Sequence, residues 1–329
     1  MTSLGPGEFV LCLEEATGKE LWRYRTDSIY KSGDGNGPRS TPVINAGMVF
    51  AVGAQGALVA INAKNGNRVW QYNIVKDFGG KMPGWGFCNS PMIEDDALIV
   101  PVGGSRGNAV MAFNKKSGAF LWKSHSDDPG YSSPIAVTIG GVRQIVVFSG
   151  TQVFAVSPTD GKLFWSYPWK TGGQVNAAVP LLVPPDKIFI SSSYDQGAAL
   201  LKVNVIKGKP AVEQVWKSKV MMNHFNSSVF KDGYLYGFDN SFLKCVEAVT
   251  GKEKWVKSGL GKGSLLLADG RLIILSEQGL LVLADASPVK FQQTASAQIL
   301  QGRCLTEPAL SGGKLFLRNQ KEMVSVSLK

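Results

Sequence analysis

Few residues in this chain have the type and spacing that catalysis or metal binding requires. Residues 103–107 match the G-x-S-x-G string of a nucleophile elbow, and residues 259–264 are rich in glycine like a phosphate-binding loop. Both motifs depend on a helix that starts at the loop, and we expect no helix at either place, so we interpret both segments as loops. His125 and His224 have no ligand spacing with each other or with a cysteine, which argues against a dedicated zinc or calcium site.

The four cysteines are interpreted as packing residues rather than as reactive ones. Cys12 and Cys245 are expected at matching places in two strands, where a buried thiol commonly fills space. Cys88 and Cys304 stand ahead of expected strands. Four cysteines allow three pairings that sequence cannot resolve, so the disulfide state and the redox compartment stay open.

The formal net charge of +10 invites a nucleic-acid or anionic-surface interpretation. Many of the lysines, however, stand beside glycine turns, where a solvated hairpin tip explains them: Lys19, Lys115, Lys116, Lys162, Lys207, Lys209, Lys252 and Lys254. No alternation of basic and aromatic residues of the RNA-binding kind accompanies them. Nucleic acid is therefore not an expected partner.

The elements that must position any site are recurring short strands. A turn glycine stands four residues before a tryptophan at Gly18/Trp22, Gly66/Trp70, Gly118/Trp122, Gly161/Trp165 and Gly251/Trp255. With Trp216 included, the tryptophans are 48, 52, 43, 51 and 39 residues apart, which is typical of a repeat of about four strands. Residues 57–61 and 68–72 alternate in hydrophobicity with the period of two expected for strands.

A second kind of turn alternates with the first along the chain. Its pairs are Ala46-Gly47, Asp95-Asp96, Gly140-Gly141, Pro185-Asp186, Asp232-Gly233, Asp269-Gly270 and Gly312-Gly313. Each pair precedes a β-rich run and is predicted to join two strands. The first kind of turn, which precedes a tryptophan, also occurs seven times if two looser examples are counted. One is Lys207-Gly208, and the other is a degenerate turn at residues 285–288, after which Phe291 takes the place of the tryptophan.

Fourteen hairpins predict an all-β fold, a β-propeller of four-stranded antiparallel blades. Residues 323–328 are expected to form a third strand of a last blade, and the chain is expected to open at residues 9–13 already in a third strand. Either the two ends share one blade, or the chain lacks an N-terminal piece of an eight-bladed ring. Together the two alternatives leave 7 to 8 blade positions, with the terminal blades incomplete or shared, and we favour the second.

The repeat runs from end to end without a linker, which predicts a single domain over residues 1–329. Residues 1–7 lack the basic start and apolar core of a signal peptide, but a truncated N-terminus would make that uninformative about export. The longest apolar stretch, residues 265–284, is interrupted by Asp269, Arg271 and Glu277. We expect two strands there and no transmembrane segment.

Residues 15–22 (EATGKELW) and 248–255 (AVTGKEKW) closely resemble the repeat of PQQ-like β-propellers, the quinoprotein alcohol dehydrogenase-like superfamily. The resemblance covers nearly the whole chain, and residues 76–86 and 130–133 are similar to a bacterial branch of PQQ-binding-like repeat proteins. In that family the outer-strand tryptophan docks on the neighbouring blade, so the resemblance implies a structural role for Trp22, Trp70, Trp122, Trp165, Trp216 and Trp255.

The resemblance is specific for fold and weak for function. Quinone dehydrogenases of this superfamily resemble one another in a vicinal cysteine pair, a calcium held by acidic and amide side chains, and a tryptophan under the quinone. This chain has no adjacent cysteines and no matching calcium string. We therefore expect no cofactor, PQQ included, and no metal.

Propeller geometry predicts where a site would lie, because the loops that enter the first strand of each blade converge on one mouth of the channel. Those loops carry polar, aromatic and cationic candidates: Arg39, Trp85, Phe87, Asn89, Tyr131, Asn176, Asn223, His224, Lys262 and Arg303. As a funnel lining they would suit an anionic or sugar-like ligand. The alternative is that they satisfy backbone groups at strand starts and pack neighbouring blades.

Two classes of function remain. The first is a non-catalytic scaffold of the bacterial cell envelope or periplasm that binds a partner protein through exposed loops, similar to the propeller subunit of outer-membrane protein assembly. The second is a quinoprotein-type oxidoreductase or a carbohydrate-active protein that uses the funnel. We favour the first because no acid/base pair or metal cage is visible. The identity of the partner or ligand and the oligomeric state are left open.

Overall fold

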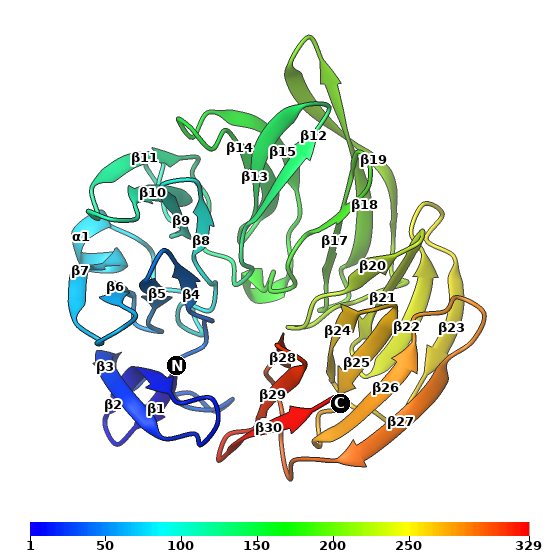
Figure 1. The fold of residues 1–329 in the computed structure, drawn as a ribbon. Coiled ribbons are helices and arrows are strands. Elements are labelled where there is room, and N and C mark those ends of the chain that lie inside the picture. The colour runs from blue at the N-terminus through cyan, green and yellow to red at the C-terminus, as the bar shows by residue number, and fades with distance from the viewer. Residues whose placement is uncertain (329) are drawn as a thin grey trace. The chain divides into compact units, whose positions relative to one another are not determined.

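Short strands joined by tight turns make up nearly all of the chain. The computed structural model describes residues 1–328, in which thirty strands, one α-helix and one 3-10 turn occur (Figure 1). The strands form eight antiparallel sheets, six of four strands and two of three strands at the ends of the chain. We call these sheets blades 1 to 8 in chain order. The prediction of an all-β fold built from four-stranded blades, with incomplete terminal blades, is confirmed.

The chain divides into two compact units. The first holds Met1–Ala177 with Val205–Ala211, and the second holds Ala178–Asn204 with the chain from Val212 on. The single domain expected over residues 1–329 stays a prediction.

The first unit contains blades 1 to 4. Blade 1 has β1 (Thr2–Leu4), β2 (Gly7–Leu13) and β3 (Glu20–Ser28), and blade 2 has β4 (Val43–Asn45), β5 (Met48–Val52), β6 (Ala57–Asn62) and β7 (Arg68–Asn73). Blade 3 has β8 (Met92–Glu94), β9 (Ala97–Pro101), β10 (Val110–Asn114) and β11 (Phe120–Ser124), and blade 4 has β12 (Ile135–Ile139), β13 (Val142–Phe148), β14 (Gln152–Val156) and β15 (Leu163–Pro168).

The second unit contains blades 5 to 8, except for the tip of the last hairpin of blade 5. Blade 5 has β16 (Leu181–Val183), β17 (Lys187–Ser192), β18 (Gly197–Ile206) and β19 (Lys209–Ser218), and blade 6 has β20 (Val229–Lys231), β21 (Tyr234–Asp239), β22 (Phe242–Glu247) and β23 (Glu253–Lys257). Blade 7 has β24 (Ser264–Ala268), β25 (Arg271–Leu275), β26 (Leu280–Asp285) and β27 (Gln292–Gln298), and blade 8 has β28 (Ala309–Ser311), β29 (Lys314–Arg318) and β30 (Met323–Ser327).

The hydrophobic core lies between consecutive blades. Phe50 of blade 2 belongs to one buried cluster with Leu98 and Phe113 of blade 3. In the second unit, Phe189 of blade 5 shares a cluster with Leu235 of blade 6. The central strands are consequently buried on both faces. Residues 57–61 of β6 are all buried, so the alternation predicted for them is wrong and the segment is a short apolar run.

Both predicted kinds of turn occur at the predicted places. The five glycines that precede a tryptophan have φ between 70° and 75°, a conformation that glycine adopts without steric cost. The pairs of the second kind lie between the first and second strands of their blades, and Ala46, Asp95, Asp232 and Asp269 also have positive φ.

The ends of the chain differ in part from the prediction. Residues 323–327 do form a third strand, as expected, but residues 9–13 are preceded by a further strand, β1, which pairs with β2. A three-residue strand is too short to show a hydrophobic period, so the pattern did not predict it. Blades 1 and 8 are separate sheets, so the alternative in which the two ends share one blade is wrong.

Three further segments depart from expectation. Residues 265–284 cover parts of three strands, β24 to β26, rather than two. A short helix, α1 (Ile74–Phe78), follows β7, capped by the side chain of Asn73, which accepts hydrogen bonds from the amides of Val75 and Lys76. The register between β26 and β27 pairs Leu283 with Ala295, so Ala295 takes the place that tryptophan has in other blades. Phe291 instead precedes β27 and packs edge-on against Trp255, with ring centroids 5.7 Å apart.

Five of the six repeat tryptophans lie against the next blade of their own unit. Each donates its indole N–H to a backbone carbonyl there: Trp22 to Ala63, Trp70 to Lys115, Trp122 to Pro158, Trp216 to Ala248 and Trp255 to Ser287, at 2.8–3.0 Å. The sixth, Trp165, donates to the side chain of Gln144 in its own blade at 2.8 Å.

Candidate binding surface

The loops that lead into the first strand of each blade, called the first-strand loops below, carry the ten residues predicted to line a funnel. Four of the ten, Phe87, Asn89, Asn176 and Asn223, are fully buried and therefore cannot line an open channel. Phe87 packs in the core between blades 2 and 3. The burial of these four residues favours the alternative that they satisfy backbone groups at strand starts and pack neighbouring strands.

Two of the three buried asparagines, Asn176 and Asn223, show that alternative role directly. The amide nitrogen of Asn176 donates to the carbonyls of Ser149 and Gly150, at 2.8 and 3.1 Å. In the second unit, Asn223 donates to the carbonyl of Phe238 at 2.9 Å and accepts a hydrogen bond from the Ser228 hydroxyl. Asn176 thus ties its loop to the turn between β13 and β14, and Asn223 ties its loop to strand β21.

Trp85 is the most prominent exposed side chain of the first-strand loops in the first unit. It is 37% exposed, and its indole N–H donates to the carboxylate of Asp34 at 3.1 Å. Its ring meets the largely buried ring of Tyr131 edge to face, with centroids 5.7 Å apart. The indole is therefore held in one orientation while one side of it faces solvent.

Arg39 and Tyr30 support this group from the loop between blades 1 and 2. The Arg39 guanidinium lies over the Tyr30 ring, 5.4 Å from the centroid, and donates to the Gly35 carbonyl at 2.8 Å. The Tyr30 hydroxyl donates to the Gly84 carbonyl at 2.8 Å. Burial raises the pKa of the nearby Cys88 thiol to about 12, so this cysteine is protonated and unsuited to nucleophilic chemistry.

Sequence analysis did not identify Glu8, a buried carboxylate beneath the same loops. Its two oxygens accept hydrogen bonds from the amides of Tyr30 and Ala54, each at 3.0 Å. Burial raises the pKa of Glu8 above its ordinary value of 4.5, and the two amides partly oppose this shift. Its partners lie 22 and 46 residues away, so no local spacing signals the contact.

A second missed group, Asp128, links three loops of the first unit. It accepts hydrogen bonds from Lys81, at 2.5 Å, and from the side chain of Gln174. The ammonium of Lys81 holds the pKa of Asp128 below its usual value. The neighbouring Asp127 binds the hydroxyls of Ser149 and Thr151. These carboxylates are structural acceptors rather than free acids or bases.

In the second unit, the candidates separate into two small groups. His224 contacts the Tyr194 hydroxyl at 3.2 Å, and its ring also lies against Phe225 with centroids 5.3 Å apart. Lys262 and Arg303 meet at Glu277, which sequence analysis did not identify. The Lys262 amide N–H bonds to it at 3.0 Å and the Arg303 guanidinium at 3.2 Å, and together they hold the pKa of Glu277 below its usual value.

Most charged groups in and beside the first-strand loops thus pair with one another or bond to backbone groups. Several large apolar and aromatic side chains, in contrast, are exposed to solvent. Met82 and Trp85, in the first-strand loops of the first unit, are 41% and 37% exposed, and Tyr194, in the turn between β17 and β18 of the second unit, is 46% exposed. Exposed aromatic and methionine side chains set among satisfied polar groups are typical of protein-binding surfaces.

The side chains that could hold a metal ion are dispersed over the described residues. Residues 1–328 contain no group of three or more His, Cys, Asp and Glu side chains arranged to hold a metal ion. The four cysteines are free thiols, and no two of them are adjacent in the chain. In the same range, no helix has the length and apolar character needed to cross a membrane.

The chain is similar to known proteins both in sequence and in fold. A family model described as "Outer membrane protein assembly factor BamB" matches residues 6–257. The solved structure of BamB from Moraxella catarrhalis superimposes with a TM-score of 0.71 at 14% identity, covering 98% of this chain and 94% of that one. At this identity the likeness establishes the β-propeller fold alone.

The curated relatives named below are each less than 30% identical in sequence to this chain. Outer membrane protein assembly factor BamB of Marinobacter adhaerens is 24% identical over 145 residues, which cover 44% of this chain and 32% of that protein. The same factor of Yersinia pestis is 22% identical over 334 aligned positions, which cover 94% of this chain and 77% of that protein. A quinoprotein ethanol dehydrogenase of Pseudomonas aeruginosa is 26% identical over 159 residues, which cover 43% and 25% of the two chains.

Proposed function

Because the chain belongs to the family of the outer membrane protein assembly factor BamB, we propose that it is a non-catalytic propeller protein that binds a partner protein through its first-strand loops. The observation that carries this proposal is Trp85. An indole that is fixed by Asp34 and Tyr131 yet faces solvent loses little conformational entropy on binding, which is the property of an interface anchor.

The state of the polar candidates supports the same function. An enzyme of this fold would need an acid/base pair or a metal-bound cofactor, and Glu8, Asp128 and Glu277, the carboxylates in or beside the first-strand loops, are committed to amides, lysine and arginine. We propose accordingly that the protein uses no PQQ and no metal. The BamB relatives are named as outer-membrane assembly factors, so we place its partner among proteins of the cell envelope or periplasm.

The loop surface is tested by removing its exposed apolar side chains. We expect a Met82→Ala/Trp85→Ala double variant to weaken binding to the purified outer-membrane assembly proteins of the same bacterium at least ~10-fold, as hot-spot residues do. Surface plasmon resonance measures the affinities. Phe120→Ala is the control, because Phe120 is 49% exposed but lies on the outer strand β11. Equal losses in both variants, or no binding by the unmodified chain, would reject the proposal.

A separate titration tests the alternative of a quinoprotein oxidoreductase. PQQ is added in the presence and absence of calcium and followed by calorimetry and absorbance. We expect no heat of binding at micromolar concentrations. Calcium-dependent binding in that range would replace the scaffold proposal with a cofactor-dependent one.

A further inference from the structure

The turn between β17 and β18 of blade 5 holds a tyrosine in a backbone conformation that a bulky residue rarely adopts. Tyr194 and Asp195 have φ angles of 56° and 62°, in the left-handed region. Two successive positive φ angles in a hairpin turn are usually supplied by Asn, Asp or Gly. The turn between β21 and β22 of blade 6 follows that rule, with Asn240 at a φ of 51°. The chain therefore keeps an aromatic ring at the blade 5 turn at a conformational cost, as binding sites often do.

The Tyr194 ring is held at the surface by the loop that leads into blade 6. Its hydroxyl lies 3.2 Å from Nε2 of His224, and the centroids of the two rings are 5.4 Å apart. The His224 ring in turn meets the Phe225 ring edge to face, with centroids 5.3 Å apart. Tyr194 is nevertheless 46% exposed. A fixed and partly exposed ring of this kind can stack against a ligand with little loss of side-chain freedom.

Hydrogen bonds join the three segments that meet around this ring. The Ser193 hydroxyl donates to Oδ1 of Asn240 at 2.6 Å, and the Asn240 backbone amide donates to the Met222 carbonyl at 3.0 Å. These bonds link the turn of blade 5 to the turn and the first-strand loop of blade 6. The positions of Tyr194 and His224 relative to each other are therefore set by the surrounding backbone as well as by their own contact.

An exposed pair of opposite charges stands beside the ring. The Asp195 carboxylate and the Lys219 ammonium are 2.6 Å apart, and their side chains are 78% and 61% exposed. Because the two charges compensate each other, the pair attracts neither an anion nor a cation strongly. The carboxylate still accepts hydrogen bonds and the ammonium still donates them. An aromatic ring next to a compensated donor and acceptor suits a neutral ligand with several hydroxyl groups.

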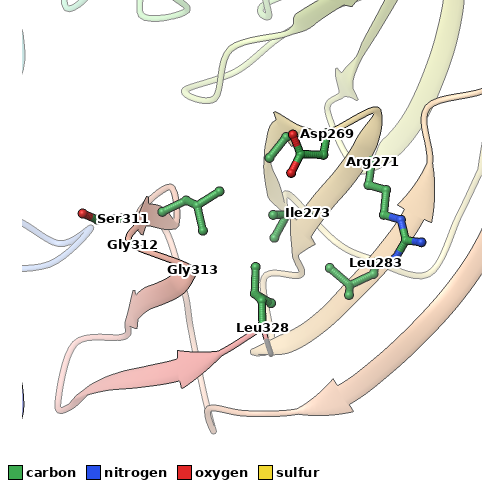
Figure 2. Close-up of a pocket in the computed structure, with 10 residues that line it drawn as sticks. Asp269, Arg271, Ile273, Leu283, Ser311, Gly312, Gly313 and Leu328 are labelled. Atoms are coloured by element: carbon green, nitrogen blue, oxygen red, sulfur yellow. The ribbon is translucent and has the colours of Figure 1, made fainter.

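The cleft between blades 7 and 8 of the same unit lacks this combination (Figure 2). It has a volume of about 640 Å³, and its lining is mostly aliphatic, with Ile273, Leu283 and Leu328 among the residues. Asp269 and Arg271 are the charged residues there, and none of the described residues that line the cleft is aromatic. A ligand that binds by stacking therefore fits the surface around Tyr194 rather than this cleft.

We propose that the surface around Tyr194 is a binding site for a neutral saccharide. A pyranose ring stacks on Tyr194, and its hydroxyl groups bond to Asp195 and Lys219 in place of water. His224 holds the tyrosine in position. A nucleobase would also stack on tyrosine, but the carboxylate of Asp195 repels the phosphates that accompany it. The site lies in the second unit, does not involve Trp85 and requires no partner protein.

A titration followed by nuclear magnetic resonance tests the site. Two neutral trisaccharides, cellotriose and triacetylchitotriose, are added to protein with ¹³C-labelled tyrosine rings. We expect at least one of them to shift the Tyr194 resonance along a saturating curve, with a dissociation constant on the order of 1 mM. The Tyr194 resonance is the one missing from the spectrum of the Tyr194→Asn variant. No shift of this resonance with either saccharide up to ~10 mM would overturn the proposal.

Two variants complete the design, with binding measured by calorimetry. Tyr194→Asn keeps the turn, because asparagine tolerates left-handed backbone, and removes the ring, so we expect it to bind the saccharide at least ~10-fold more weakly. Phe242→Ala is the matched control, because Phe242 is a 48% exposed ring in β22 of blade 6 outside the Tyr194 contacts. It should leave binding unchanged. Equal affinities of Tyr194→Asn and the unmodified chain, or equal losses in both variants, would overturn the proposal. So would a chain that binds no saccharide but loses affinity for outer-membrane assembly proteins in Tyr194→Asn, since the ring would then serve a protein interface.

Discussion

Glu8 shows what a single buried side chain does in this protein. Its carboxylate receives the amides of Tyr30 and Ala54, which stand in two different loops of the first unit. A buried amide without an acceptor costs about 1–3 kcal/mol, so the carboxylate contributes through the two donors that it satisfies. Burial nevertheless penalises its charged form, and its pKa is raised accordingly.

We expect Glu8→Gln to lower the free energy of unfolding by about 1–3 kcal/mol, because the amide group of glutamine can accept from only one of the two donors. The raised pKa adds a pH dependence of definite sign. Protonation of Glu8 is easier in the folded state, so its stabilising contribution is complete below pH ~4.5 and is lost as pH rises through the folded pKa. The difference between wild type and variant should therefore widen as pH falls from 7 towards 4.5.

Urea unfolding of both proteins at several pH values measures this difference. Glu15→Gln, a change at an exposed carboxylate, is the control and should show neither effect. A difference that narrows as pH falls would contradict the assigned direction of the Glu8 pKa.

At the scale of elements, one hairpin turn recurs with different surroundings. Gly18 and Gly118 both have φ close to 70°, at 71° and 73°. A Cβ at Gly18 would meet nothing within 4 Å, whereas a Cβ at Gly118 would lie 2.8 Å from the ring of Trp70. Where a turn lies against the tryptophan of the preceding blade, as at Gly118, glycine is therefore needed both for the backbone conformation of the turn and to leave room for the indole.

This pair separates the two costs of losing a glycine. We expect Gly18→Ala to cost about 1–2 kcal/mol, the penalty for an alanine with left-handed backbone. Gly118→Ala should cost at least ~1 kcal/mol more, because the new methyl group also displaces the indole. Thermal and urea unfolding of the two variants provide the comparison. Equal losses would mean that the indole shifts freely and that the turn alone requires glycine.

At the scale of the whole molecule, stability is built from contacts between consecutive blades. The buried clusters each draw on neighbouring sheets, and five tryptophans bond to the next blade of their unit. In such an array a local defect is felt mainly by the repeats that share the damaged junction.

Trp122 tests this nearest-neighbour view. It is 7% exposed, packs on Gly161 and bonds to Pro158, so Trp122→Ala should cost about 3–5 kcal/mol. Hydrogen exchange should accelerate in β8–β15, on both sides of the junction, and change little in blades 6 to 8. Trp85→Ala, which removes an exposed indole, should change neither. Uniform acceleration throughout the chain would instead indicate a single cooperative unit.

Sequence predicted the repeats well but did not mark several buried or paired carboxylates, for a reason visible in particular residues. The tryptophans and turn glycines follow from spacing alone, since hairpin geometry is local. Glu8, Asp128 and Glu277 acquire partners from distant loops, and no local pattern marks them. Sequence marks the buried Asn176 and Asn223 as candidate funnel residues, because an asparagine ahead of a strand looks the same whether it faces a ligand or a carbonyl.

The chain's own sequence determined the all-β repeat, its turns, and the residues that dock one blade on the next, because these depend on periods of two and on glycine backbone freedom. Only the tertiary structure decided which loop side chains are buried, that the two ends form separate blades, and that Ala295 rather than Phe291 stands opposite Leu283. Those outcomes depend on register and on contacts between segments far apart in sequence, where packing rather than local preference selects the arrangement.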